Sequence, residues 1–115
     1  MTDALPTDAL LSDDQRMIRH SARTFARARL APGAAARDRA CAFPRAELAA
    51  MGELGLLGMM VPETWGGVGA DHLAYVLAVE EISVADGSLG AMMALHNGLV
   101  CSPIRDHGSD AQKAR

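Results

Sequence analysis

The chain has 115 residues and a formal net charge of −3; half of its residues are hydrophobic, yet only 3% are aromatic. This length allows one domain with a modest core of Ala, Leu, Met and Val side chains, a composition that favours close helix-on-helix packing. Cys41 and Cys101 stand alone without CxxC spacing, and no apolar run approaches the roughly 18 residues that cross a bilayer, so a disulfide framework, a metal site and a membrane span all lack support.

The first eleven residues contain acids but neither Lys nor Arg. Signal peptides and mitochondrial presequences carry basic residues, so residues 1–11 resemble neither, and we expect a disordered leader on a cytoplasmic protein. Ser12 to Gln15 then has the form of a capping box, in which both side chains bond to backbone N–H groups at a helix start. Apolar residues follow at helical spacing from Met17 to Ala26, which predicts an amphipathic helix interrupted at Pro32, with a kinked continuation beyond it.

Basic residues are concentrated near the N-terminus. Eight of the eleven Lys and Arg residues precede Ala46, and Arg16, Arg19, Arg23 and Arg27 recur at spacings of three and four, which places them on one helix face. Such a face suits either an anionic partner or solvent. Because the whole chain is acidic, we favour a solvated face and expect no nucleic-acid partner.

A second, short helix opens at Phe43-Pro44 and ends at Gly55, with an apolar stripe that includes Leu48 and Met51. From there to residue 70, repeated glycines predict one long irregular loop.

This Gly/Pro loop has two interpretations. Free backbone N–H groups could cradle a phosphate. Alternatively, Pro62, Gly66 and Gly67 shape a tight turn, and Trp65 fills a gap beneath it. The loop lacks both the GxGxxG order after a strand and the Lys of a P-loop, so we favour the packed turn.

Asp71 and Asp86 are predicted to cap a third and a fourth helix. The fourth is apolar nearly all round, so we expect it to be the buried centre of the bundle and to end at Ser102-Pro103. Ser109 to Gln112 repeats the capping box, which normally precedes several turns, and we therefore expect the chain to be the front piece of a larger protein. The predicted fold is all-α, an up-and-down bundle of four to five helices with one long Gly/Pro loop.

Four stretches, in this order and spacing, resemble the N-terminal helical domain of the acyl-CoA dehydrogenases. They are residues 11–18, 38–44, 54–67 and 75–83, and the family pattern continues through residues 96–99 and 108–113. The resemblance implies a domain over residues 12–115, with the family's middle β-domain and C-terminal helical domain absent.

The resemblance also implies a flavoprotein of fatty acid metabolism, an oxidoreductase that converts an acyl-CoA thioester to a 2-enoyl-CoA with FAD as hydride acceptor. In that family the catalytic carboxylate and most FAD contacts lie outside this domain. We therefore expect no catalytic, cofactor-binding or metal-ligating residue here, and no turnover or FAD binding by the chain alone. Glu80 and Glu81 are the nearest carboxylates, and we interpret Glu80 as capping or bracing a helix. Implied partners are copies of the same chain, as a dimer or tetramer, and an electron-transfer flavoprotein.

The resemblance places Ala91, Met92 and Leu95 of the fourth helix as candidate lining of the acyl-chain pocket. Core packing explains the same residues without any ligand. Two rivals to the family function remain: a stand-alone helical interaction module that pairs with a separately encoded flavoprotein subunit, and the front domain of a related acyl-CoA oxidase or flavin monooxygenase.

Overall fold

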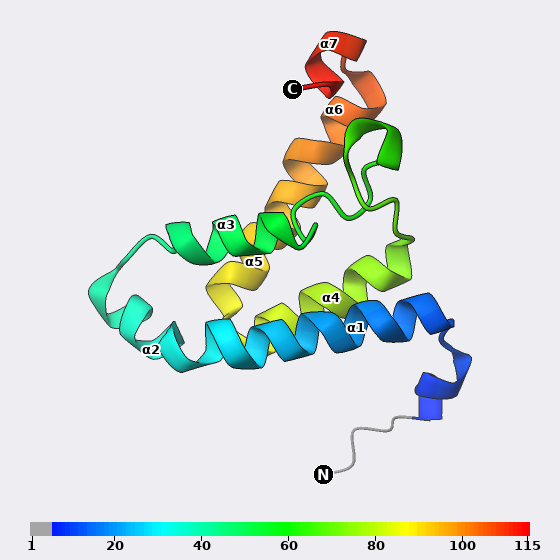
Figure 1. Cartoon of the computed structure of the whole chain (residues 1–115). Helices are drawn as coiled ribbons and strands as arrows, with labels where there is room; N and C mark the ends of the chain where they lie inside the picture. The colour runs from blue at the N-terminus through cyan, green and yellow to red at the C-terminus, as the bar shows by residue number, and fades with distance from the viewer. Residues whose placement is uncertain (1–5) are drawn as a thin grey trace.

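The computed structural model describes residues 6–115, and the described residues form helices, turns and loops without a strand (Figure 1). The predicted all-α class is confirmed. The elements are η1 (Pro6–Leu10), α1 (Asp13–Phe25), η2 (Ala26–Leu30), α2 (Ala31–Ala40), α3 (Arg45–Glu53), η3 (Glu63–Trp65), α4 (His72–Ala85), α5 (Gly87–Leu95), η4 (His96–Cys101), α6 (Ser102–His107) and α7 (Asp110–Lys113). Of these, η1 and η3 are 3-10 turns, whereas η2 and η4 are π-helical.

The helix starts follow the capping rules read from the sequence. Ser12 and Ser109 form complete capping boxes at α1 and α7. The carboxylates of Asp71 and Asp86 accept from the N–H groups three residues on and cap α4 and α5. These predictions are confirmed because an N-cap depends on residues that are close in sequence.

Two long rods run through prolines. The first rod comprises α1, η2 and α2; the second comprises α5, η4 and α6. In each, a π turn ends just before the proline: the Ala31 N–H donates to the Ala26 carbonyl, and the Ser102 N–H donates to the Asn97 carbonyl, five residues back. The wider turn relieves the clash between a proline ring and the carbonyl four residues earlier. The predicted continuation past Pro32 is confirmed, whereas the predicted helix end at Ser102-Pro103 is wrong.

The core lies where α1 and α4 run side by side and α5 crosses them (Figure 1). Its buried residues are mostly small or unbranched: Ala22, Ala26, Leu30, Met51, Leu56, Met59, Ala78, Ile82, Leu89 and Met93. Gly90 lets α5 approach α4, because a Cβ there would meet the side chain of Ser83 and come within 2.9 Å of its Cα. The contact explains why small residues are needed where these helices meet.

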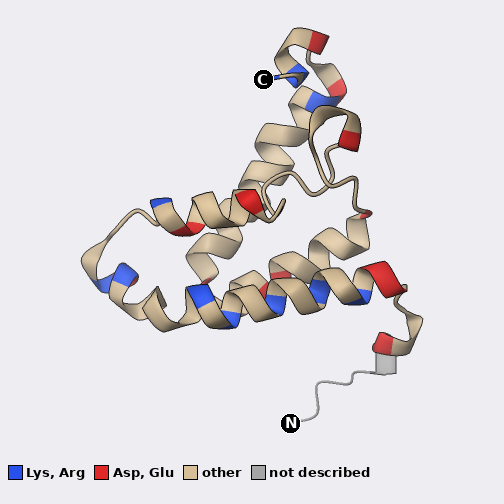
Figure 2. Ribbon diagram, in the orientation of Figure 1, with Lys and Arg blue, Asp and Glu red and all other residues tan. Residues whose placement is uncertain are grey.

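Basic residues recur along α1 (Figure 2), and three of its arginines form ion pairs. Arg16 pairs with Asp13 at 2.7 Å, Arg19 with Asp8 at 2.6 Å, and Arg23 with Glu81 of α4 at 2.7 Å. The prediction of a solvated face is therefore wrong for Arg19 and Arg23. Both find their partners on segments that sequence spacing along one helix does not reveal.

The predicted leader is partly ordered. Residues 1–5 lie outside the described residues, but Pro6–Leu10 forms the 3-10 turn η1, and Asp8 holds it to α1 through the Arg19 ion pair. The expectation of disorder is wrong for this part.

The second rod is buried on one side only. Leu89, Met93 and Asn97 are at most 2% exposed, but Leu95 is 54% and Leu99 is 71% exposed. The expectation that this helix forms a fully buried centre is therefore wrong. The described residues extend over 46 × 41 × 19 Å, and a slab about two helix diameters thick cannot cover a helix on both faces. No helix in the described part of the chain is long and apolar enough to span a membrane.

Candidate functional site

The Gly/Pro loop uses its backbone N–H groups internally. Five consecutive groups, from Gly66 to Ala70, donate to carbonyls of the same loop at 2.8 to 3.1 Å. Gly67 packs against backbone, since an added Cβ would lie within 2.6 Å of the Val61 carbonyl carbon. The phosphate-cradle interpretation requires free N–H groups and is wrong for this run of residues. The loop is a packed turn, as favoured from the sequence.

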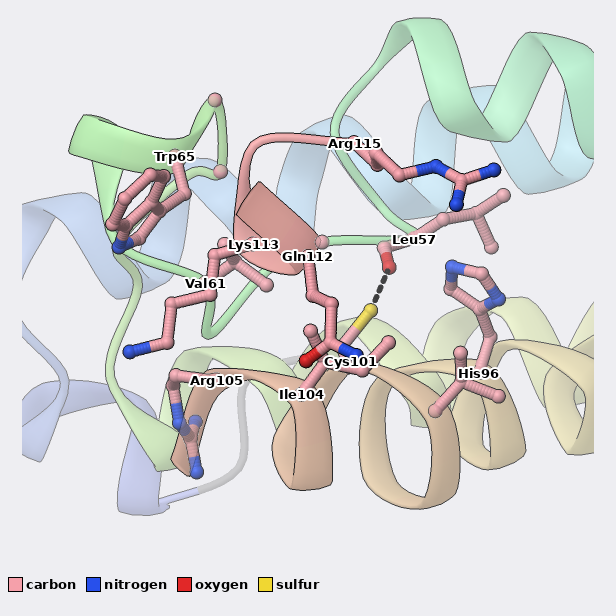
Figure 3. A pocket seen from close by; sticks show the side chains of 14 residues that line it. Leu57, Val61, Trp65, His96, Cys101, Ile104, Arg105, Gln112, Lys113 and Arg115 are labelled. Carbon is pink, nitrogen blue, oxygen red and sulfur yellow. Dashed lines mark hydrogen bonds between the residues drawn. The ribbon is translucent and has the colours of Figure 1, made fainter. Parts of the chain in front are cut away.

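The loop and the second rod enclose a pocket of about 370 Å³, which we call the Trp65 pocket (Figure 3). Its apolar lining comes from both sides, with Leu57, Val61 and Trp65 on the loop and Val100 and Ile104 on the rod. The remaining side chains that line it are polar or basic: His96, Cys101, Arg105, Gln112, Lys113 and Arg115. None of these residues is an acid, so the pocket contains no carboxylate base.

Three side chains of the Trp65 pocket are held in defined contacts. The Cys101 thiol donates to the Leu57 carbonyl at 3.5 Å, and burial raises the pKa of this thiol, which disfavours the reactive thiolate. Arg105 donates to the Met60 carbonyl at 3.3 Å and pairs with Asp106. Lys113 lies 5.9 Å from the centre of the Trp65 ring. The pocket is therefore suited to packing and binding rather than to nucleophilic chemistry.

Sequence reasoning missed this pocket because Val100 and Ile104 flank the expected helix end at Pro103. The available signal was their four-residue spacing, which places them on one face only if the helix continues.

The predicted lining residues do not meet in a cavity. Ala91 and Leu95 are exposed, one turn apart on the same helix. Met92 is half-buried against the core and lines a separate cavity of about 200 Å³ beside Arg37 and Cys41. Neither Ala91 nor Leu95 lines this cavity or the Trp65 pocket. Their proposed role therefore depends on a surface that would face them from outside the described residues.

Two partly buried carboxylates are committed to ion pairs. Glu81 accepts two hydrogen bonds from Arg23, at 2.7 and 3.1 Å. Asp86 accepts from Arg37 at 2.7 Å and from the Leu89 N–H at 3.2 Å. Burial opposes ionisation of Asp86, but these two bonds outweigh it and lower its pKa, so the group is a weak base. Among the described residues, no cluster of three His, Cys, Asp or Glu side chains is placed to hold a metal ion.

The family model for the N-terminal domain of acyl-CoA dehydrogenases matches residues 12–115. The chain belongs to the acyl-CoA dehydrogenase family. The resemblance read from the four sequence stretches is thereby confirmed. This acyl-CoA dehydrogenase domain is 48% identical over 103 residues to the mitochondrial short-chain specific acyl-CoA dehydrogenase of Mus musculus, covering 90% of this chain and 25% of that protein.

Two solved structures show the same domain. A chain in a study of the electron transferring flavoprotein of Acidaminococcus fermentans is 38% identical, with a TM-score of 0.87, over 99% of this chain and 28% of that one. The butyryl-CoA dehydrogenase of Megasphaera elsdenii is 31% identical, with a TM-score of 0.84, over 90% of this chain and 28% of that one. The domain spans about a quarter of the length of its relatives.

The glycine turn and the N-termini of α4 and α5 do not fit the pyrophosphate of FAD, the cofactor that the family resemblance implies. A dinucleotide pyrophosphate is usually held by free N–H groups of a glycine turn or of a helix N-terminus. Here the glycine turn is internally bonded, and the N-termini of α4 and α5 carry the carboxylates of Asp71 and Asp86, which repel phosphate. No step of the chemistry can be assigned to a flavin held by these residues.

Proposed function

We propose that this chain serves as the N-terminal helical domain of an FAD-dependent acyl-CoA dehydrogenase, which oxidises an acyl-CoA thioester to a 2-enoyl-CoA. The observation that carries the proposal is the family match over residues 12–115, at about a quarter of the relatives' length. Removal of an α-proton requires a base of tuned pKa in a dry pocket. Glu81 and Asp86 are ion-paired and Glu80 is exposed to solvent, which supports the proposal that the base lies in another part of the enzyme.

The chain alone is proposed to hold no FAD and to turn over no acyl-CoA. In the full-length enzyme, bound FAD would accept the hydride. The test is to mix the purified chain with excess FAD, remove free flavin by gel filtration, and record flavin absorbance and dye reduction with butyryl-CoA. We expect neither signal. A stoichiometric flavin band or acyl-CoA-dependent dye reduction would contradict this proposal.

A chimera tests the positive part of the proposal. Residues 12–115 would replace the matching segment of the Megasphaera elsdenii butyryl-CoA dehydrogenase, which this chain matches with a TM-score of 0.84. We expect the chimera to bind FAD and to oxidise butyryl-CoA, since relatives with short-chain names share the domain. A folded chimera that binds FAD but lacks this oxidation would contradict the assignment.

The proposed pocket lining by Ala91, Met92 and Leu95 can be tested in the same chimera. Leu95 is 54% exposed and therefore free to contact a substrate held by the rest of the enzyme. We expect Leu95→Gly to shift the preferred substrate from butyryl-CoA toward longer acyl chains, because the side chain would no longer limit the length of the pocket. Leu99→Gly, at a more exposed position on the same rod, is the control. An unchanged preference in Leu95→Gly would exclude the lining role.

Partners follow from the same proposal. We propose self-association of the complete enzyme as a dimer or tetramer, and electron transfer to an electron-transfer flavoprotein; the similarity to a chain from the Acidaminococcus fermentans study supports the second. The rival, a separate helical module that completes another flavoprotein subunit, is favoured by the exposed apolar residues of the second rod. Mixing this chain with the Megasphaera elsdenii enzyme lacking its N-terminal domain separates the two. Restored activity in the mixture would favour the module, whereas activity only in the fused chimera would favour a covalent domain.

A further inference from the structure

Asn97 is a polar side chain buried in an otherwise apolar core. It is 2% exposed, and it lies in the π turn η4. Its amide nitrogen donates to the carbonyls of Leu56 and Met93, both at 2.9 Å, and its amide oxygen accepts from the Met59 N–H at 3.0 Å. Both donors and one acceptor position of the amide are thus satisfied, which is what allows it to be buried.

Two further side chains of the second rod also bond to the backbone of the loop. Asn97, Cys101 and Arg105 are spaced four residues apart, and we call them the loop clasp. Asn97 bonds to the backbone of Leu56 and Met59. Cys101 bonds to the backbone of Leu57, and Arg105 bonds to the backbone of Met60. Residues 56–60 lie outside helix and strand, so these side-chain bonds replace the partners that regular secondary structure would supply.

The π turn helps to align the clasp. In a straight α-helix, each four-residue step drifts around the axis by about 40°. The step from Asn97 to Cys101 lies in the π turn η4, which is wider than an α-helix and rotates less per residue. The step from Cys101 to Arg105 lies in α6, so the drift of the two steps does not add up in one direction. The turn is stabilised by the Ser102 hydroxyl, which donates to the Asn97 carbonyl at 3.0 Å.

We propose that Asn97 is the positioning residue of the Trp65 pocket: by bonding the loop backbone to the second rod, it holds the Gly/Pro loop as a fixed wall, so that the pocket is preformed and the loop is not a lid. Asn97 acts through Leu56 and Met59 and lines no part of the pocket itself. The proposal concerns the architecture of this chain and does not depend on the activity of the complete enzyme.

Trp65 is the only tryptophan of the chain and lies in the loop, so its fluorescence reports on the loop and on the residues packed against it. In the full chain, Asn97→Ala should make Trp65 more accessible to acrylamide. It should also raise the hydrogen-exchange rates of the Met59 and Ala70 amides by about ten- to hundredfold, while the circular dichroism of the helices is retained. Gly98→Ala is the matched control, because it lies in the same π turn and its new Cβ would meet nothing within 4 Å. Unchanged Trp65 and amide signals in Asn97→Ala would overturn the proposal.

A second variant covers the case in which Asn97→Ala fails to fold. Asn97→Asp keeps the size of the side chain and the acceptor for Met59, but when ionised it has no donor for the Leu56 and Met93 carbonyls. Residues 56–60 and Met93 carry no charge; the nearest titratable groups on the rod are His96, Cys101 and Arg105. Burial therefore raises the pKa of the new carboxyl.

We expect Trp65 of Asn97→Asp to become exposed to quencher as the pH rises from 5 to 9 through the raised pKa of the carboxyl, and to be protected below that pKa, where the protonated carboxyl can donate to one carbonyl. The unmodified chain should show no such change over this range. Protection equal to that of the unmodified chain at every pH between 5 and 9 would overturn the proposal, whatever Asn97→Ala does.

Discussion

Where α1, α4 and the start of α5 meet, the chain buries the apolar side chains that face inward; along η4, α6 and α7, several apolar side chains remain exposed. Ile82 and Leu89 are fully buried in the first region, which we call the bundle core. In the second, the distal arm, Leu99 is 71% and Ile104 is 42% exposed. The sequence pattern therefore shows which apolar residues can be buried. Whether a given residue is buried depends on whether another helix or loop packs against it.

The two regions also differ in their polar contacts. In the bundle core, Arg23 and Arg37 join different helices through paired carboxylates that are about one tenth exposed. The distal arm is joined to the rest mainly through the loop clasp, which bonds side chains to loop backbone. Loss of a core contact should therefore destabilise the whole fold, whereas loss of a distal contact should act locally.

The largest effect is expected from a cavity in the bundle core. Ile82→Ala removes a fully buried side chain from α4 and should lower the free energy of unfolding by about 3 kcal/mol. Val84→Ala on the same helix, at a position 81% exposed, should change it by less than about 0.5 kcal/mol. Urea unfolding followed by circular dichroism measures both. Similar losses for the two variants would contradict the division between buried and exposed apolar residues.

Removal of the Arg37 ion pair should have the next largest effect. Arg37 donates to the Leu30 carbonyl and to Asp86, both at 2.7 Å, and lies 3.4 Å from Glu47. Arg37→Ala leaves Asp86 nearly buried without its cation and should cost about 2 kcal/mol in the same unfolding experiment. Arg39→Ala, at an exposed position two residues on, is the control. If Arg37→Ala lowered the free energy of unfolding by less than Arg39→Ala, the ion pair would not stabilise the core.

A smaller effect is expected from pH. Because the pKa of Asp86 is lowered below its ordinary value of 3.8 by Arg37 and the Leu89 N–H against the cost of burial, the ionised form is stabilised by folding. The resulting stability is present above pH 3.8 and is lost as the pH falls through the lowered pKa, by at most about 1.4 kcal/mol per pH unit. Urea unfolding between pH 5 and pH 2 should show a shallower acid loss in Asp86→Asn than in the unmodified chain. Equal slopes would exclude Asp86 as a contributor.

The smallest effect is expected in the distal arm. Leu99→Gln replaces a side chain that is 71% exposed and should change the free energy of unfolding by less than about 0.5 kcal/mol. Thermal unfolding of the variant and of the unmodified chain gives the comparison. A marked loss would mean that the exposed leucine is covered in solution.

Local rules predicted much of this fold. The caps at Ser12, Asp71, Asp86 and Ser109 and the packed glycine turn depend on residues near one another in sequence, and each was found where expected. Features that depend on distant partners were not predictable in this way.

The continuation through Pro103 needed a π turn, which has no local signature, and the Arg23–Glu81 pair joins residues 58 positions apart. The burial of Asn97 follows from a loop about 40 residues earlier in the chain. The only sign of this burial in the sequence was that Asn97 is a single amide residue among apolar neighbours. The pocket role of Ala91, Met92 and Leu95 stays a prediction, because it concerns surfaces beyond the described residues.

Residue-resolved hydrogen exchange of the whole chain is the most direct test of the division between the two regions. The account predicts that amides of α1 and α4 exchange only through global unfolding, whereas amides of α6 and α7 exchange through local openings of clearly lower free energy. Equal protection across α1, α4, α6 and α7 would contradict it, because the distal arm would then be as firmly held as the bundle core.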